Sequence, residues 1–305
     1  MLEKTELVWA VAIILPLIFV FKADLASSWI ELTLGTVMFL SIRPFFKQNS
    51  GIVKDWKKIL FSILLNYILL SGAYILVASI FFPSTSEYFI GYILLAIVPP
   101  AVSIIPLCYL TKCDIKVADT AIFLGYALAL IIIPISTISL FGSQVNFLML
   151  VGTLSFVIII PLILAYITRK SSSKVFDYTK IFTNILIGII IFTTVSVNRS
   201  MLLNISDPSI LKMLAISFGI VFIMGFAAYF IGRRIVPEMD AINYSLYATQ
   251  KNEATGITLA LVMFTHATAI PLILALVTQF IYFIVLERIV MRNAAKVDAA
   301  TVNIP

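Results

Sequence analysis

Long apolar runs, separated by short stretches rich in glycine, proline, serine or charge, fill most of this chain. A helix needs about 20 apolar residues to cross a bilayer. The runs therefore predict ten membrane-spanning helices, at residues 7–21, 29–42, 59–82, 88–110, 118–140, 147–168, 181–197, 211–231, 242–264 and 267–291. The first two runs are short for a span, which suggests tilted or only partly spanning helices.

A polar cluster interrupts the ninth run: Thr249, Gln250, Lys251, Asn252 and Glu253. A charged residue at bilayer depth costs roughly 2.5–3.5 kcal/mol on insertion scales, so such residues are normally kept for a function. Lys251 and Glu253 lie two residues apart and would face different ways on a regular helix. The helix is therefore unwound here, or the two charges have separate partners. Gln250 and Asn252 offer carbonyl oxygens to an ion or amides to a substrate.

The fourth run is broken by Pro99 and Pro100. Each proline lacks a backbone donor, and in hydrocarbon the freed carbonyls need other partners or a water-filled cavity. Interrupted helices at matching places in two halves of a chain indicate the binding site of a transporter. We therefore expect the site where the fourth and ninth spans cross. Ser103 and Asn66 are further candidates for its lining, with hydrogen bonding between helices as the alternative.

The composition restricts the fold class. Of 305 residues, 61% are hydrophobic and only 12% are charged, whereas about 25% charged is usual in soluble domains. The sequence predicts an all-α polytopic membrane protein with a single membrane domain, residues 1–305. Ten spans divide into five and five, and an odd number per half gives inverted-topology repeats. The predicted repeats are residues 1–142 and 143–305.

The net charge of +6 does not indicate nucleic-acid binding, because the basic residues lie in short loops where they set membrane orientation. Counting alternate loops, one side holds Lys4, Arg43, Lys47, Lys54, Lys57, Lys58, Lys112, Lys116, Arg169, Lys170, Lys174, Lys180, Arg233, Arg234, Arg288, Arg292 and Lys296. The other side holds Lys22, Arg199 and Lys212. This asymmetry predicts a multi-pass protein of the cell membrane with both termini in the cytoplasm.

The predicted cytoplasmic end of the fourth span holds Cys108 and Cys113. That compartment is reducing, so we expect no disulfide between them. Asp114 and Asp119 are expected in a solvated turn. The sequence contains no Walker, dinucleotide-binding, nucleophile-elbow or metal-ligand pattern, so ATP-driven pumping and enzymatic chemistry are disfavoured.

At the two broken spans the chain resembles the bile acid:sodium symporter superfamily. Residues 99–105 (Pro-Pro-Ala-Val-Ser-Ile-Ile) match the family pattern Pro-Gly-Gly-x-x-Ser-Asn, and residues 109–114 (Tyr-Leu-Thr-Lys-Cys-Asp) match Tyr-Leu-x-x-Gly-Asp. Residues 252–260 (Asn-Glu-Ala-Thr-Gly-Ile-Thr-Leu-Ala) are similar to Gln-Asn-Ser-Gly-Leu-Ala-x-Ala-Leu-Ala. The resemblance implies ten spans in two inverted five-span repeats, with broken fourth and ninth helices that cross.

The sodium ligands that the resemblance implies are largely replaced here. The fourth-span Ser-Asn becomes Ile104 and Ile105, which carry no side-chain oxygen. With Asn252 aligned to the family motif, the family glutamine becomes Lys251 and the family glutamate falls near Tyr247. A lysine ammonium at a cation site can stand in for the ion and repel a second one.

A shifted alignment, which matches Gly256 to the family glycine, leads to another interpretation. It places Glu253 at the glutamine and Thr249 at the glutamate. Sodium coupling through Glu253 then remains open.

The expected function is secondary active transport of a small organic anion by alternating access, within the lipid bilayer. Lys251 would pair with a substrate carboxylate or carry a coupling proton, without sodium, and no resident cofactor or metal is expected. The alternatives are an ordinary sodium symporter that uses Glu253, and a membrane receptor that binds its ligand without moving it.

Overall fold

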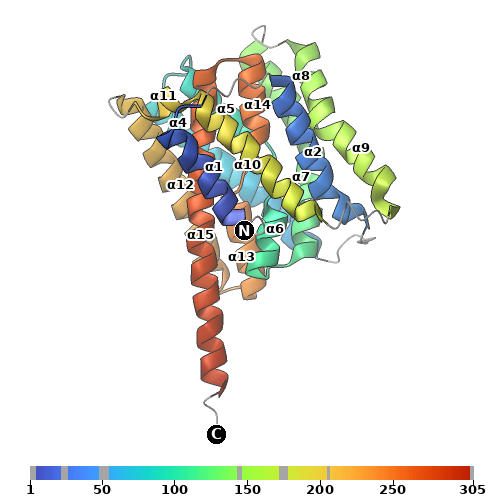
Figure 1. Ribbon diagram of the computed structural model, residues 1–305. Coiled ribbons are helices and arrows are strands. Elements are labelled where there is room, and N and C mark those ends of the chain that lie inside the picture. Colours follow the sequence, from blue (N-terminus) through green and yellow to red (C-terminus); the bar gives the residue numbers. More distant parts are fainter. Residues whose placement is uncertain are drawn as a thin grey trace.

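A computed structural model describes residues 5–21, 27–47, 55–142, 146–171, 178–204 and 207–302. Within these ranges the chain is helical and forms no β-strand, as Figure 1 shows. The α-helices are α1 (Thr5–Ile18), α2 (Ser27–Lys47), α3 (Trp56–Leu64), α4 (Ser71–Phe81), α5 (Glu87–Ile97), α6 (Ile104–Thr111), α7 (Ile115–Phe141), α8 (Phe147–Leu154), α9 (Ile160–Ile167), α10 (Thr179–Val197), α11 (Arg199–Leu202), α12 (Pro208–Gly232), α13 (Glu238–Tyr247), α14 (Glu253–Met263) and α15 (His266–Val302).

Two of the predicted spans contain a π-helical turn, in which the backbone bonds five residues back. These turns are η1 (Leu65–Leu70), between α3 and α4, and η3 (Ser155–Ile159), between α8 and α9. The short 3-10 turn η4 (Thr168–Lys170) follows α9. Such π-helical turns occur frequently at functional sites, and η1 contains Asn66.

Five helical stretches are long and apolar enough to cross a membrane: Trp56–Phe81, Ile115–Phe141, Phe147–Lys170, Pro208–Gly232 and His266–Val290. Shorter apolar helices lie at Leu7–Ile18, Glu87–Ile97, Ile181–Val197 and Glu253–Met263. The chain is therefore a helical membrane protein, as the sequence predicts. Ten spans in two inverted repeats stay a prediction, and the repeat boundary at residue 143 lies outside the described residues. So do four of the basic residues behind the orientation: Lys4, Lys22, Lys54 and Lys174.

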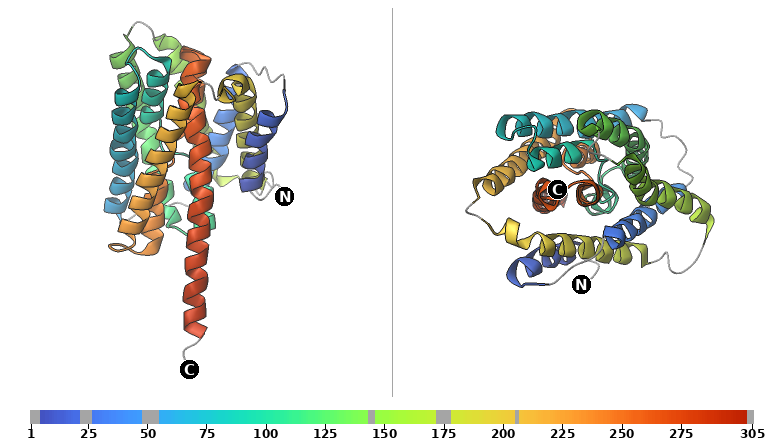
Figure 2. Two further views of the ribbon diagram at one scale, coloured as in Figure 1. Left: turned by 90° about the vertical axis from the view of Figure 1, so that its left-hand side faces the viewer. Right: turned by 90° about the horizontal axis from the view of Figure 1, so that it is seen from above.

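The helices form two packed groups. In the first, α1 packs along α10, and α2 packs against α9, α10 and η3. In the second, α15 packs against α5, α12 and α14. Helix α4 packs against α5 and α12, and α13 packs against α12. Seen from above, α15 lies towards the middle of the bundle, with α1 and α10 together along one side (Figure 2).

Two helices extend well beyond the apolar runs that predicted them. The second run predicted residues 29–42, but α2 continues to Lys47. Its side chain at Arg43 is buried, and it donates to the carbonyl oxygens of Thr168 and Ser171 at 2.6–3.2 Å, so a charged residue is accommodated inside the helix. The last helix, α15, continues to Val302 and extends well beyond the other helices (Figures 1 and 2).

The expectation of two free cysteines was wrong, because Cys108 and Cys113 are joined in a disulfide. The cause is local backbone geometry. Helix α6 ends at Thr111, and the next residue, Lys112, has a left-handed φ of 56°. The chain folds back there, so that the Cys113 N–H donates to the Cys108 carbonyl at 3.2 Å. This turn brings the two Cα atoms within 4.8 Å, a normal separation for a bridge. The reducing compartment on which the expectation rested says nothing about such a turn.

The expectation of a solvated turn at Asp119 was also wrong. Asp114 caps the start of α7, but Asp119, one turn later, is buried. Helices α3 and α6 pack against α7, so one face of its second turn is covered.

Candidate functional site

The first break separates α5 from α6 at residues 98–103. Pro99 and Pro100 have no N–H, so neither can donate to the carbonyl four residues earlier. Those carbonyls belong to Leu95 and Ala96, in the last turn of α5. Val98 is extended, with φ −68° and ψ 153°, and the chain leaves the helix there. The proline pair therefore ends the helix in the middle of its apolar run, as the sequence predicts.

The second break separates α13 from α14 at residues 248–252. Asn252 begins the new helix, because its side-chain oxygen accepts from the Thr255 N–H at 3.1 Å. Asparagine is among the best residues for this capping position. Lys251 therefore lies in the unwound segment and Glu253 in the first turn of α14. The two charged residues consequently have separate surroundings.

The two breaks cross. Pro100 and Lys251 form an isolated antiparallel bridge, in which Asn252 N–H donates to Pro99 C=O at 2.8 Å and Ala101 N–H donates to Gln250 C=O at 3.3 Å. These bonds satisfy backbone groups that the helices leave open, which is what unwound backbone requires at bilayer depth. Figure 1 shows α5, α6, α13 and α14 around this place.

Lys251 is completely buried, and its ammonium closes the end of α5. The Nζ atom donates to the carbonyl oxygens of Ala96 at 2.8 Å and Val98 at 3.0 Å, and it lies 4.6 Å from the centre of the Tyr67 ring. In a continuous helix, the N–H of residue 100 would donate to the Ala96 carbonyl, but proline has no N–H. The lysine thus supplies the donor that Pro100 lacks, and the ring adds a cation–π contact. Carbonyl oxygens around a buried positive charge are also how proteins hold alkali cations.

Helix α4 and the π-turn before it hold both broken helices. Asn66 Nδ2 donates to the carbonyl oxygens of Tyr247 and Gln250, each at 2.9 Å, and so caps the end of α13. Ser71 Oγ donates to the Ala96 carbonyl at 2.6 Å, at the end of α5. Asn66 therefore holds the backbone beside the crossing through hydrogen bonds, and it does not line the cavity described below.

Two residues that the sequence did not single out complete the crossing. The Lys251 N–H donates to Gln279 Oε1 of α15 at 3.1 Å, and Gln250 Nε2 donates to the Gln279 carbonyl at 3.3 Å. Asn252 Nδ2 donates to the Tyr126 hydroxyl of α7. A glutamine inside the last apolar run was a signal for the first; a single tyrosine among twelve gave no signal for the second.

Glu253 is buried at the start of α14, and its Oε1 has no hydrogen-bond partner among the described residues. It lines a cavity that lies between the two groups of helices. One wall of this cavity comes from α1, α2 and α10, and the other from the two breaks and α15. The lining includes Trp9, Met38, Ile190, Ser103, Gln250, Lys251, Asn252, Glu253 and Gln279. The cavity is therefore largely apolar, with polar atoms concentrated at the crossing.

The structure brings most of the predicted residues together. Gln250, Lys251, Asn252, Glu253 and Ser103 line the cavity, while Pro99 and Pro100 create the break beside it. Thr249 is different: its hydroxyl donates back to the carbonyls of Ser245 and Leu246 in its own chain segment, and it is fully buried away from the cavity.

Interrupted helices that cross inside an apolar bundle, beside a cavity between two helix groups, are typical of the binding sites of membrane transporters. The model of the SBF-like CPA transporter family matches residues 47–294, well over half of the chain. The chain therefore belongs to this family and is a membrane transporter, not an enzyme, which confirms the expected kinship with bile acid:sodium symporters. Its partners are accordingly a small-molecule substrate and the lipid bilayer. Among curated proteins, no relative matches the chain.

Proposed function

We propose that this protein is a secondary active transporter of a small organic anion, and that the Lys251 ammonium occupies the crossing in place of a bound sodium ion. The observation that carries the proposal is the bonding of Nζ to the carbonyl oxygens of Ala96 and Val98. A fixed positive charge on these oxygens leaves no room for a metal cation on the same oxygens. Uptake should then proceed without sodium.

The cavity suits an anion with an apolar body. Most of its wall is aliphatic or aromatic, from residues such as Ile13, Leu34 and Phe280. Two half-helices, α6 and α14, begin at the crossing. The first residues of α14 line the cavity, as do Ala101–Ser103 directly before α6. The N-terminal ends of such half-helices carry partial positive charge and favour anionic groups.

Alternating access would use the division into two helix groups. The cavity lies between α1, α2 and α10 on one side and the crossing on the other, so a rocking motion of one group would open it to either face of the membrane. In this proposal the ten spans form two inverted repeats, and both termini face the cytoplasm of a cell-membrane protein.

A second candidate is an ordinary sodium symporter that uses Glu253. It is favoured by one observation: a buried carboxylate oxygen at the cavity has no partner among the described residues. Sodium would then bind at Glu253, on the cavity side of the crossing.

The test is uptake of organic anions with differently sized apolar bodies into vesicles that contain the purified protein, with and without sodium. The variants are Lys251→Ala and Glu253→Gln, and Lys57→Ala is the control because Lys57 is exposed and far from the crossing in the sequence. We expect sodium-independent uptake that is lost in Lys251→Ala and kept in the control. Sodium-dependent uptake that survives Lys251→Ala but fails in Glu253→Gln would establish the second candidate. Saturable binding with no flux in the wild type would identify a receptor.

A further inference from the structure

A second buried polar group, Asp119, lies near the start of α7, outside the crossing. The Asp119 side chain is buried, with the residue 3% exposed, and its Oδ1 has no hydrogen-bond partner among the described residues. A buried carboxylate that keeps its charge without a counter-charge is costly in free energy. Something other than the described side chains must therefore neutralise it.

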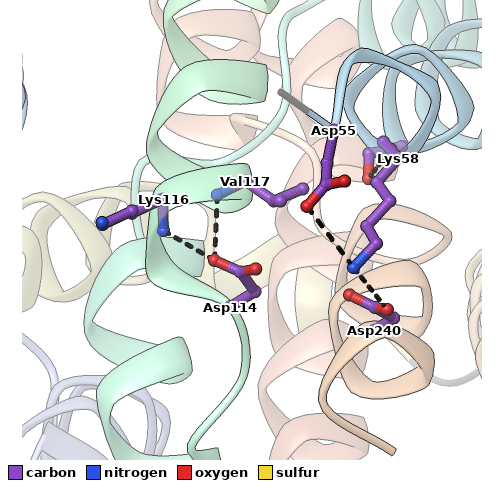
Figure 3. A network of polar contacts seen from close by, with 7 residues as sticks. Asp55, Lys58, Asp114, Lys116, Val117 and Asp240 are labelled. Atoms are coloured by element: carbon purple, nitrogen blue, oxygen red, sulfur yellow. Dashed lines mark hydrogen bonds and ion pairs between the residues drawn. The ribbon is translucent and has the colours of Figure 1, made fainter. Parts of the chain in front are cut away.

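Helix initiation does not need Asp119. Asp114 already caps α7, because its Oδ1 accepts from the backbone N–H groups of Lys116 at 3.1 Å and Val117 at 3.3 Å (Figure 3). Asp119 stands one turn further into the bundle, where α13 packs against α7: the Tyr247 hydroxyl donates to the carbonyl of Ala118 at 2.7 Å. The carboxylate is therefore placed at the contact between two helices.

Asn243 lies at the same contact. It is one helical turn before Tyr247 on α13, and residues four apart share a face of a helix. Its side chain is completely buried, and its Nδ2 has no partner among the described residues. Its Oδ1 is 3.9 Å from the Cys108 sulfur of α6. Helices α6, α7 and α13 thus enclose two buried polar groups with unused hydrogen-bonding capacity.

The nearby lysine is already engaged. Lys58 of α3 lies between Asp240 and Asp55, with its Nζ 2.8 Å and 3.8 Å from their carboxylates (Figure 3). No ion pair reaches Asp119 within the described part of the chain. The charged groups on this part of α7 and on the elements packed against it are Arg43, Asp55, Lys57, Lys58, Lys112, Asp114, Lys116, Glu238 and Asp240.

The number of ligands selects the cation. A divalent metal ion requires several oxygen ligands, and the described residues contain no group of three or more acidic, histidine or cysteine side chains that could hold one. A proton requires only one oxygen. A protonated carboxyl also gains a donor that a neighbouring amide oxygen or a water can accept.

We propose that Asp119 is a proton-binding site, and that its carboxyl, together with Asn243, carries the exchangeable proton of the transport cycle. Tyr126 lies seven residues after Asp119 on α7, which is two helical turns or about 10 Å along the helix. The Tyr126 hydroxyl accepts a hydrogen bond from Asn252 at the crossing. The proton site therefore shares a helix face with the crossing. This inference rests on the proposed function, in which the crossing takes no sodium and uptake proceeds without it.

The test is infrared difference spectroscopy of the full-length protein in lipid, titrated across the physiological pH range in H₂O and D₂O. A protonated carboxyl gives a carbonyl stretch that a carboxylate lacks, and the band shifts on deuterium exchange. The variants are Asp119→Asn, Asp119→Ser and Asn243→Leu. Asp114→Asn is the matched control, because asparagine still caps α7, and Glu253→Gln removes the buried acid at the crossing.

We expect a band that titrates, exchanges in D₂O, disappears in both Asp119 variants, moves in Asn243→Leu and is unchanged in Asp114→Asn. Three results would overturn the proposal: no such band, a band that persists at every pH and so marks a fixed neutral acid, or a titrating band that is lost only in Glu253→Gln. Binding of radioactive sodium that Asp119→Asn abolishes would also overturn it, because the site would then hold a metal ion. None of these results requires the substrate, so they leave the organic-anion proposal to be judged by uptake.

Discussion

The Lys251 ammonium lies 2.8 Å from the carbonyl oxygen of Ala96, a carbonyl whose usual helical donor is missing because residue 100 is proline. One break in the chain thus supplies the acceptor and the other supplies the donor. The lysine is part of the backbone hydrogen bonding of the crossing, as well as a charge beside the cavity.

Asn66→Leu should destabilise the protein. The amide donates to the carbonyls of Tyr247 and Gln250. Its loss leaves the buried Tyr247 carbonyl without this donor, at about 1–3 kcal/mol, while the Gln250 carbonyl keeps the bond from the Ala101 N–H. Thermal unfolding in detergent measures the change. The control is Ser62→Ala on α3, because that buried hydroxyl bonds only to Lys58 C=O in its own helix. Equal melting temperatures for the two variants would contradict the capping role of Asn66.

Gly125→Ala should disturb the crossing directly. A Cβ atom at Gly125 would lie 2.7 Å from Cδ and 2.8 Å from Cγ of the Pro100 ring, and a proline ring cannot rotate away. Overpacking of this kind typically costs about 1–3 kcal/mol. The control is Gly72→Ala, where a Cβ meets nothing within 4 Å. We expect a lower melting temperature and reduced uptake for Gly125→Ala alone, and wild-type behaviour in both variants would argue against close packing at Pro100.

Gln279→Leu should destabilise the crossing while the Lys251 charge stays in place. The Gln279 side chain accepts from the Lys251 backbone N–H, and an unpaired buried N–H costs about 1–3 kcal/mol. Uptake assays and melting curves should both show a loss. Thr278→Val is the neighbouring control, since the Thr278 hydroxyl bonds only to the Leu274 carbonyl of its own helix. If Thr278→Val proves the more damaging change, Gln279 does not support the crossing.

Arg43→Met should separate stability from transport. Arg43 donates to the carbonyls of Thr168 and Ser171 and so fixes the end of α9 against α2. We expect a reduced melting temperature with an unchanged apparent affinity for substrate, because Arg43 does not line the cavity. The comparison is Arg169→Met, because this half-buried arginine donates to the nearby Tyr166 carbonyl. A changed affinity in Arg43→Met would mean that the α2 end takes part in substrate binding.

Much of this arrangement was predictable from sequence, and the reasons are physical. Apolar runs report membrane helices, and Pro99-Pro100 reports a helix break because proline removes donors whatever the surroundings. The polar cluster at 249–253 indicated the second break because charged residues at bilayer depth cost free energy and are normally kept for a function. Partners across the fold were not predictable: nothing near Lys251 in the sequence indicates Ala96, Tyr67 or Gln279.

The errors follow the same division. Asp119 lies three residues after Lys116, near the predicted start of a span, and its burial depends on helices packed against α7, among them α3 and α6. The disulfide depends on one left-handed residue, Lys112, which no hydrophobic pattern reports. Thr249 was grouped with its neighbours in the cluster, but a threonine hydroxyl readily bonds to its own helix, as it does here.

The central claim is that the Lys251 ammonium takes the place of a cation at the crossing. The most direct measurement is thermal unfolding of wild type and Lys251→Ala in sodium and in choline salts of equal concentration. The account predicts that Lys251→Ala is destabilised in choline and regains part of its stability in sodium, because the ion can occupy the vacated carbonyl oxygens, whereas the wild type is indifferent to sodium. A wild type that sodium stabilises more than it stabilises Lys251→Ala would contradict the claim.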